Sequence, residues 1–426
     1  MWFCLASRAV APLRSVPDPT IRSQGGGSDG VRRRSALRVA YLEGIALFVT
    51  RQPWHPGDGL DSHNPHMRLA LALARRSLGR SSPNPAVGAV VVRDGTVVGR
   101  GSTAPVGGPH AEVLALAQAG AAARGADLYV TLEPCCHHGR TPPCTTAVIA
   151  AGIRKVHVAT LDPNPQVAGG GAAALRAADV AVEIGLGGAP ARRLIAPFRQ
   201  WVLRGRPQVL AKYAMTLDGR IASRSGDSRW VSGPEARLLA HRLRDVSDAI
   251  MVGSGTVLAD DPALTTRLPD ETAPHHPLRV ILDSRGRLPL TSRVFDPALE
   301  GQTLVATVAA PDPWRRTLED RGLSVWSLPP DAQGRVALGQ LLARLAAERG
   351  VASLLLEGGA AVLGAAFGAG LIDHVLAFIA PKVIGGRDAP GPVGDPGRPR
   401  MAQALSIDRL RWLRVGQDLA VWGALP

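Results

Sequence analysis

The amino-acid sequence predicts an α/β protein with two consecutive domains. Its 426 residues are enough for two or three domains with full cores. Short apolar runs of strand length alternate with helical periodicity along most of the chain, and an Arg-Gly-Arg-Pro segment at 204–207 separates two such regions. We therefore expect a three-layer α/β/α sandwich over residues 63–188, a connecting helix and linker over 189–206, and a second α/β domain with a mostly parallel sheet over 207–426.

The first domain is expected to begin with a helix over residues 67–78, where leucines recur and Gly79 supplies the stop. Apolar runs at 87–92 and 96–98 flank Asp94-Gly95, the strongest short signal for a β-hairpin. A helix should open at His110 and continue to Ala119. The remaining elements are strand 128–132, helix 145–151, strand 156–160, helix 172–177 and strand 180–184.

The second domain contains further short apolar runs, which predict strands at 208–214, 249–252, 279–282, 303–306 and 353–356. Gly358-Gly359 and a helix follow the last strand. Glycines let a backbone approach a ligand, and free amides at a helix N-terminus suit phosphate, although a tight strand-to-helix turn is the alternative. Polar loops at 216–220 and 254–262 follow other strands. Three such loops at one sheet edge would form a cleft for a nucleotide and a substrate.

Residues 1–62 are rich in Arg and poor in acidic residues, which is typical of a transit peptide. We favour instead an unstructured extension, or a translation start upstream of the true one. The sequence has no run of 18 apolar residues that would span a membrane. Three of its four cysteines fall within 135–144, which favours metal binding over disulfides and a cytoplasmic location.

The formal net charge of +14 does not by itself indicate a nucleic-acid partner. Arginine is spread over the whole chain, and aromatic residues, at 4%, are too few for a base-stacking surface. Guanidinium groups instead fit a phosphorylated small substrate. Only Lys155, Lys212 and Lys382 are lysines, so a lysine in this chain is expected to be there for its compact ammonium. Lys212 is the functional candidate among them.

The segment Pro-His-Ala-Glu at 109–112, followed by Pro-Cys at 134–135 and by Cys144, predicts a catalytic zinc site. One His and two Cys supply three protein ligands and leave a fourth position for water. Glu112 lies two residues after His110, where a carboxylate can carry a proton between that water and the substrate. The spacing departs from the usual Pro-Cys-x-x-Cys of zinc deaminases, because eight residues separate Cys135 from Cys144.

Other residues near this motif are alternative ligands. Cys136 could compete with Cys135, but we expect the adjacent pair to point in different directions and the first, after Pro134, to bind. His137 and His138 could also coordinate, although we place them beside the substrate.

The order of these motifs closely resembles the bifunctional riboflavin-biosynthesis family, in which a diaminohydroxyphosphoribosylaminopyrimidine deaminase is fused to a 5-amino-6-(5-phosphoribosylamino)uracil reductase. The resemblance covers roughly residues 66–422. It is carried by the runs SPNPAVG (82–88), PHAE (109–112), TLEPCCHHGRTPPC (131–144), DPNPQV (162–167), MTLDGR (215–220), GSGTVLADDPALT (253–265), LEGG (356–359) and APKVIGG (380–386).

The resemblance implies a cytidine-deaminase-like domain followed by a dihydrofolate-reductase-like domain, with Zn²⁺ and NADPH as cofactors. Zinc would be held by His110, Cys135 and Cys144, with Glu112 as the catalytic proton shuttle. The positions that match the family's NADPH contacts are Ala214, Trp230, Thr256, Asp260, Ser284, Gly359, Ala360, Ala361, Val362, Leu363, Gly364 and Ala365. Those that match its substrate contacts are Asn84, Lys212, Ser228, Arg244, Leu264, Arg267 and Glu357. Arg244 and Arg267 are the candidates for the substrate phosphate.

Two positions depart from the family pattern. Thr103 stands where the family usually has a His, seven residues before His110, which puts one deaminase substrate contact in doubt. Cys136 replaces a usual Ser. The family also implies a homo-oligomer, a dimer or a tetramer.

Two other functions remain open at this point. The chain could deaminate another base, on tRNA for example, and carry an inactive reductase domain. It could also be a basic zinc protein that binds nucleic acid without catalysis, which would need a fourth zinc ligand such as Cys136 or His138.

Overall fold

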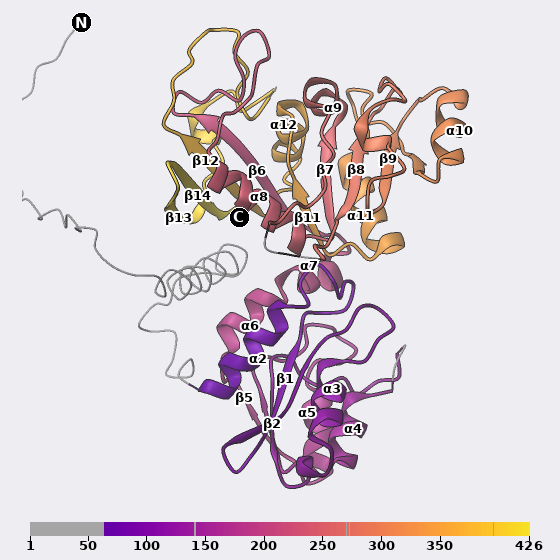
Figure 1. The fold of residues 1–426 in the computed structure, drawn as a ribbon, viewed down its shortest axis with the longest axis vertical. Coiled ribbons are helices and arrows are strands. Elements are labelled where there is room, and N and C mark those ends of the chain that lie inside the picture. The colour runs from indigo at the N-terminus through magenta and orange to yellow at the C-terminus, as the bar shows by residue number, and fades with distance from the viewer. Residues whose placement is uncertain (1–63, 140–141, 270, 272, 395) are drawn as a thin grey trace, which may run out of the picture. The chain divides into compact units, whose positions relative to one another are not determined.

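The computed structural model describes residues 64–139, 142–269, 271, 273–394 and 396–426, and within them it contains two β-sheets (Figure 1). One sheet has five strands in the order β2-β1-β3-β4-β5, and the other has nine in the order β10-β9-β8-β7-β11-β6-β12-β14-β13. The prediction of an extension over residues 1–62 lies outside the described residues. None of the helices in the described ranges is long and apolar enough to cross a membrane.

The five-stranded sheet combines a hairpin with parallel strands. β1 pairs antiparallel with β2 and β3, while β3, β4 and β5 run parallel. The strands are β1 (Gly88–Arg93), β2 (Thr96–Ser102), β3 (Asp127–Val130), β4 (Lys155–Val158) and β5 (Ala181–Ile184). The helices are α2 (Pro65–Arg75), α3 (Ala111–Ala119), η2 (Gly120–Ala123), α4 (Cys144–Ala150), α5 (Gly170–Ala177) and α6 (Gly188–Leu194).

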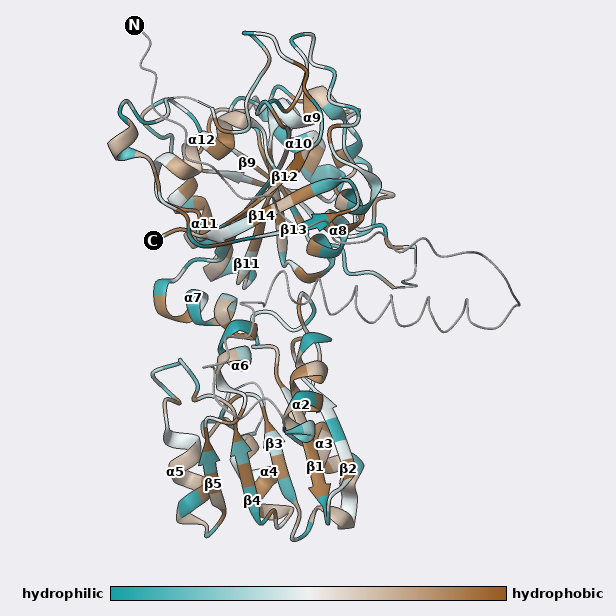
Figure 2. Ribbon diagram, turned by 90° about the vertical axis from the view of Figure 1, so that its left-hand side faces the viewer, coloured by the Kyte–Doolittle hydropathy of each residue, from teal (hydrophilic) through white to brown (hydrophobic). Residues whose placement is uncertain are grey.

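The apolar side chains of β1 point alternately to the two faces of this sheet, and helices cover both faces. Ala89 and Val91 pack in one core with residues of α3, α4 and α5, whereas Val90 and Val92 pack in a second core with α2 and α6. Successive strand residues point to opposite faces, so an uninterrupted apolar strand needs helices on each side. In Figure 2, β1 is accordingly drawn mostly in brown. The predicted three-layer sandwich is confirmed.

The predicted single connecting helix is wrong, because the chain forms two helices there. α6 ends at Leu194 and α7 (Ala196–Arg204) begins after Ile195, whose φ of −93° and ψ of 8° are not helical. Pro197 lies in the first turn of α7, where its missing N–H costs nothing. In a continuous helix the proline ring would clash with the carbonyl four residues earlier, so the break falls beside it.

The nine-stranded sheet is parallel from β10 to β12 and ends in an antiparallel hairpin of β14 and β13. Its strands are β6 (Gln208–Thr216), β7 (Ala249–Gly253), β8 (Leu278–Leu282), β9 (Thr303–Thr307), β10 (Ser324–Ser327), β11 (Ser353–Leu356), β12 (His374–Ala380), β13 (Asp408–Val415) and β14 (Asp418–Ala424). The helices are α8 (Pro234–Val246), α9 (Ser254–Asp260), η3 (Arg293–Phe295), α10 (Asp312–Asp320), α11 (Leu338–Arg349), α12 (Ala360–Gly368) and η4 (Met401–Gln403).

Helices cover both faces of this sheet as well. α11 and α12 pack on one face, and α8, α9 and α10 pack on the other. The three central parallel strands β7, β11 and β6 end at Gly253, Leu356 and Thr216, so the three polar loops expected to form a cleft follow neighbouring strands. This edge is where ligands bind in open parallel sheets.

Candidate functional site

The predicted zinc ligands lie together although they come from three different elements. His110 precedes the first turn of α3, Cys135 follows β3, and Cys144 opens α4. Their ligand atoms all lie within 4.8 Å of one another, with His110 Nδ1 at 3.2 Å from Cys144 Sγ and 3.7 Å from Cys135 Sγ. Tetrahedral zinc with bonds of about 2.0 Å to nitrogen and 2.3 Å to sulfur needs ligands at about this separation. The three residues therefore fit the metal.

Charge at this group is already suited to a cation. A hydrogen bond from the Cys144 thiol, with a further one from His110, lowers the pKa of Cys135, while the same contact raises the pKa of Cys144. The pair therefore favours a thiolate at Cys135. The main-chain N–H of Cys144 also donates to Cys135 Sγ at 3.4 Å. Thiolate is the form of cysteine that binds zinc.

Glu112 is buried beside these ligands, in the first turn of α3. Burial raises the pKa of its carboxyl to about 7, and a hydrogen bond with the Cys144 side chain acts in the opposite direction. A carboxyl with a pKa near neutrality exchanges protons readily in both directions, as a general acid and base must.

Cys136 and the two histidines after it are not part of the metal-binding group. Among the described residues this group contains only His110, Cys135 and Cys144. Cys136 points to α5 instead, because a Cβ added to Gly170 would lie 3.0 Å from its Sγ. The expectation that the adjacent cysteines point in different directions is confirmed, and the structural zinc site with four protein ligands loses its support.

Glu133, which sequence reasoning did not single out, fixes the loop behind the zinc-binding turn. Its buried carboxylate accepts hydrogen bonds from the main-chain N–H groups of Asp162 at 3.1 Å and of Gly169 and Ala172, both at 2.9 Å. Gly171 lies against the turn so closely that a Cβ would overlap the carbonyl oxygen of Pro134. The local signal was a carboxylate inside an otherwise apolar run, which is rarely buried without partners.

Thr103, which departs from the family pattern, has a side-chain hydroxyl that is hydrogen-bonded within the chain. Its buried hydroxyl accepts a hydrogen bond from the main-chain N–H of Val87 at 3.1 Å and donates one to the carbonyl of Pro85 at 3.0 Å. It thereby joins β2 to the turn that carries Asn84. The threonine hydroxyl therefore helps to hold that turn.

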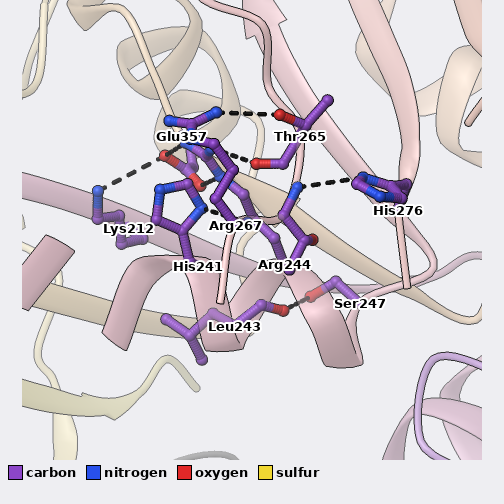
Figure 3. Close-up of polar contacts among 10 residues, drawn as sticks. Lys212, His241, Leu243, Arg244, Ser247, Thr265, Arg267, His276 and Glu357 are labelled. Carbon is purple, nitrogen blue, oxygen red and sulfur yellow. Dashed lines mark hydrogen bonds and ion pairs between the residues drawn. The ribbon is translucent and has the colours of Figure 1, made fainter. Parts of the chain in front are cut away.

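A second polar cluster lies at the edge of the nine-stranded sheet (Figure 3). Glu357, directly after β11, accepts two hydrogen bonds from Arg244 of α8, at 2.7 Å from Nε and 2.9 Å from Nη2. Lys212 of β6 lies 3.5 Å away on its other side. Burial alone would raise the pKa of Glu357, but the charges of Arg244 and Lys212 lower it to about 2. The cluster therefore keeps a carboxylate and two cations.

Arg267 adds a third cation beside this cluster. Its side chain is exposed, and its Nη1 donates to the Thr265 hydroxyl at 3.0 Å. With Lys212 and Arg244 it outweighs Glu357, so the cluster carries a net positive charge that suits an anion. Sequence reasoning missed His241, whose imidazole Nδ1 accepts the main-chain N–H of Arg267 at 3.2 Å. Nothing in the local pattern of α8 distinguishes it from an ordinary polar helix residue.

The residues predicted to hold the nucleotide lie along the same edge. A Cβ added to Gly359, whose φ is 46°, would lie 3.1 Å from Thr256 Oγ1, so the glycine backbone runs directly over α9. The Asp260 carboxylate accepts a hydrogen bond from Ser228 at 3.0 Å, which brings a predicted cofactor residue and a predicted substrate residue together. Trp230 is exposed, and the guanidinium carbon (Cζ) of Arg237 lies over its indole ring, 4.5 Å from the ring centre.

The burial or position of three predicted residues limits which of their atoms can contact a ligand. Leu264 is buried in the core beside Val257, so only its main chain can face a ligand. Ser284 follows β8, two strands away from β11, and its hydroxyl accepts the N–H of Val336 at 3.1 Å. Ala214 lies on β6 with a half-buried side chain.

The fold and the two sites define a class of protein: a zinc-dependent deaminase domain followed by a dihydrofolate-reductase-like reductase domain. Two family models match the same halves, the cytidine and deoxycytidylate deaminase zinc-binding region over residues 60–160 and the RibD C-terminal domain over residues 207–421. The chain belongs to the RibD family of riboflavin-biosynthesis proteins. Members of this family combine a deaminase and a reductase in one chain, with zinc and NADPH as cofactors.

Individual relatives match nearly along their whole length. Riboflavin biosynthesis protein RibD of Actinobacillus pleuropneumoniae is 42% identical over 355 residues, which cover 83% of this chain and 93% of the relative. RibD of Escherichia coli K12 is 40% identical, with 84% and 97% covered. Among solved structures, Acinetobacter baumannii RibD has a TM-score of 0.76 at 38% identity, and covers 85% of this chain and 98% of that structure. A Thermotoga maritima diaminohydroxyphosphoribosylaminopyrimidine deaminase/5-amino-6-(5-phosphoribosylamino)uracil reductase has a TM-score of 0.72 at 34% identity, with 85% and 98% covered.

Proposed function

We propose that this protein deaminates 2,5-diamino-6-(5-phosphoribosylamino)pyrimidin-4(3H)-one and then reduces the ribosyl group of the product with NADPH, which yields 5-amino-6-(5-phosphoribitylamino)uracil. The observation that carries the proposal is the presence in one chain of a three-ligand metal group with a buried glutamate beside it and of a positively charged cluster next to the Gly358-Gly359 turn. The first suits hydrolytic loss of an amine, and the second suits a phosphorylated substrate.

In the deaminase domain, His110, Cys135 and Cys144 would hold the metal. Bound zinc supplies Lewis acidity, which makes a coordinated water acidic enough to act as a nucleophile near neutral pH. Glu112 takes a proton from the water and delivers it to the pyrimidine ring nitrogen, and a further proton goes through it to the departing amine. Water is consumed and ammonia is released, so no oxidant is needed.

In the reductase domain, NADPH would be held by Gly359–Ala365, Thr256, Ala214, Trp230, Asp260 and Ser284. It would supply a hydride for C1′ of the ring-opened ribosyl group, and solvent would supply the proton that completes the gain of two hydrogens. Arg267 and Arg244 bind the substrate phosphate, since guanidinium pairs with phosphate through two hydrogen bonds. Lys212, paired with Glu357 at 3.5 Å, would lie near the reacting carbon. Ser228, the main chain of Leu264 and, in the first domain, Asn84 would complete the substrate contacts. Arg267→Ala should raise the KM for the deaminated substrate with little change in kcat, as measured by NADPH oxidation; an unchanged KM would remove Arg267 from the phosphate site.

The proposal is tested by mass spectrometry of the product formed by the purified, zinc-loaded protein. Without NADPH, the substrate should exchange an amine for an oxygen; with NADPH, it should also gain two hydrogens. Deamination without reduction would limit the proposal to the first half. Release of ammonia from RNA with no oxidation of NADPH would favour the alternative of a base deaminase with an inactive reductase domain.

The partners in this proposal are small molecules and further copies of the same chain. The free cysteines 135, 136 and 144 fit a reducing compartment, in keeping with a cytoplasmic enzyme. Neither nucleic acid nor a membrane is required. Analytical ultracentrifugation would decide between a dimer, a tetramer and a monomer.

A further inference from the structure

We propose that His241 is a positioning residue of the reductase site, which fixes the segment that carries Arg267 and so sets the affinity for the substrate phosphate. This inference rests on the proposed function of Arg267. His241 belongs to neither the predicted cofactor residues nor the predicted substrate residues.

Two side chains of α8 tie the same segment to the helix. His241 and Arg244 are three residues apart and so lie on the same face of α8. Arg244 Nη1 donates to the Thr265 carbonyl at 3.0 Å, and His241 Nδ1 accepts the Arg267 N–H at 3.2 Å. The segment Thr265–Arg267 is therefore bonded to α8 at both ends, by Arg244 at Thr265 and by His241 at Arg267 (Figure 3).

The middle residue of the segment, Thr266, is bonded to a histidine outside α8. The Thr266 N–H donates to His276 Nδ1 at 3.3 Å, and His276 itself faces Glu300, whose carboxylate lies 2.7 Å from its Nε2. Arg267 therefore has its main chain anchored to α8 while its guanidinium remains exposed. A cation held by its backbone is better prepared for an anion than one on a free loop.

The contact requires a neutral imidazole. Since Nδ1 accepts a hydrogen bond, the single proton of the ring must be on Nε2. Burial, together with the charges of Arg244 and Arg267, lowers the pKa of His241 to about 4, so the ring is neutral at pH 7. Arg244 and Arg267, the cations that suit this cluster to phosphate, thus also keep the His241 acceptor available.

Three substitutions of His241 distinguish the role of Nδ1 from the role of Nε2 and from that of the apolar part of the ring. In His241→Asn the side-chain oxygen takes the position of Nδ1, and in His241→Gln the amide reaches only the position of Nε2. His241→Leu removes both. We expect the Leu and Gln variants to raise the KM for the deaminated substrate about tenfold with kcat within about twofold, and the Asn variant to stay within about threefold of the wild-type KM.

Two readouts guard against a general loss of structure. The deaminase rate of each variant serves as an internal control, because His241 does not belong to that domain. The Kd for NADPH, measured by calorimetry, reports whether the proposed NADPH site is intact. Equal KM values for the Leu and Asn variants, a loss of kcat instead of affinity, or weakened NADPH binding would overturn the inference.

A binding experiment distinguishes failure of this inference from failure of the proposed function. If the wild-type protein oxidised no NADPH with the deaminated substrate, the proposed function would fail, and calorimetry with ribose 5-phosphate would still test the role of His241. We expect tenfold weaker binding by His241→Leu than by wild type, and near-wild-type binding by His241→Asn. Equal affinities, or no binding to the wild type, would refute the role.

Discussion

Replacement of Glu357 by Gln should destabilise the reductase domain markedly, because among the described residues Glu357 is the one carboxylate in an ion pair with Lys212 and Arg244. The side chains of Glu357 and Arg244 are 7% and 12% exposed, so water screens this cluster weakly. The pKa of Glu357 falls from 4.5 to about 2 on folding. At 1.36 kcal/mol for each tenfold change in proton affinity, the cluster contributes about 3 kcal/mol to stability at pH 7.

Calorimetric unfolding measures this contribution. For a domain of this size, about 3 kcal/mol corresponds to a fall in Tm of about 6–12 °C. A matched control is Glu348→Gln, which breaks an i,i+4 pair with Arg344 of similar length, 2.8 Å, whose two side chains are 36% and 50% exposed. Exposed helix pairs contribute about 0.3–0.5 kcal/mol, so this variant should unfold within about 2 °C of the wild type.

The dependence on pH gives a second signature. Because the pKa of Glu357 is lower in the folded state, the unfolded chain binds more protons between pH 4.5 and pH 2. The wild type gains this stability above pH 4.5 and loses it as the pH falls through that window, whereas Glu357→Gln has no such contribution to lose. If the two glutamine variants unfolded at the same temperature, the reasoning about the buried cluster would be refuted.

The deaminase site yields three further predictions. Glu112→Gln should retain zinc, measured by elemental analysis, but lose about 10²–10⁴-fold in ammonia release; retained activity would exclude Glu112 as the proton carrier. Cys144→Ser should lose most of the bound zinc, and Cys136→Ser should not; equal zinc content in both would contradict the ligand assignment. Gly171→Ala should weaken zinc retention because its methyl group would overlap a main-chain oxygen of the zinc-binding turn, while Gly368→Ala, with open space around it, should behave as wild type in the same chelator competition.

The zinc group could be predicted from the sequence because its residue types and spacing form a recognisable motif, although His110 lies 25 and 34 residues from Cys135 and Cys144. Cys135 follows β3 and Cys144 opens α4, and His110 stands directly before α3. Glu133 and His241 were missed because no motif marks their contacts. Their partners are main-chain N–H groups 26 to 39 residues away, and any residue type can supply a main-chain N–H. A carboxylate in an apolar run signals that Glu133 has partners but not which ones.

Some strands could likewise be predicted from the sequence, whereas others were missed. Continuous apolar strands such as β7 were predicted, because burial on both faces leaves an uninterrupted hydrophobic run. β13 was missed: it carries arginines at 409, 411 and 414 and leaves Trp412 exposed, so its sequence does not resemble a buried strand. β12 and β14 were also missed, although they flank the reductase site through the pairing of β12 with β6.

Because of the order in which their strands pair, the two sheets become complete at different times during synthesis of the chain. Every strand of the five-stranded sheet is complete once residue 184 has been made, so this half can fold while the rest of the chain is still on the ribosome. In the nine-stranded sheet, β6 comes first but pairs only with β11 and β12, which end at residues 356 and 380. Lys212 therefore lies on an unpaired strand until most of the protein has been translated. A C-terminal truncation before β12 would keep the pairing of β6 with β11 but leave the other edge of β6 exposed to aggregation.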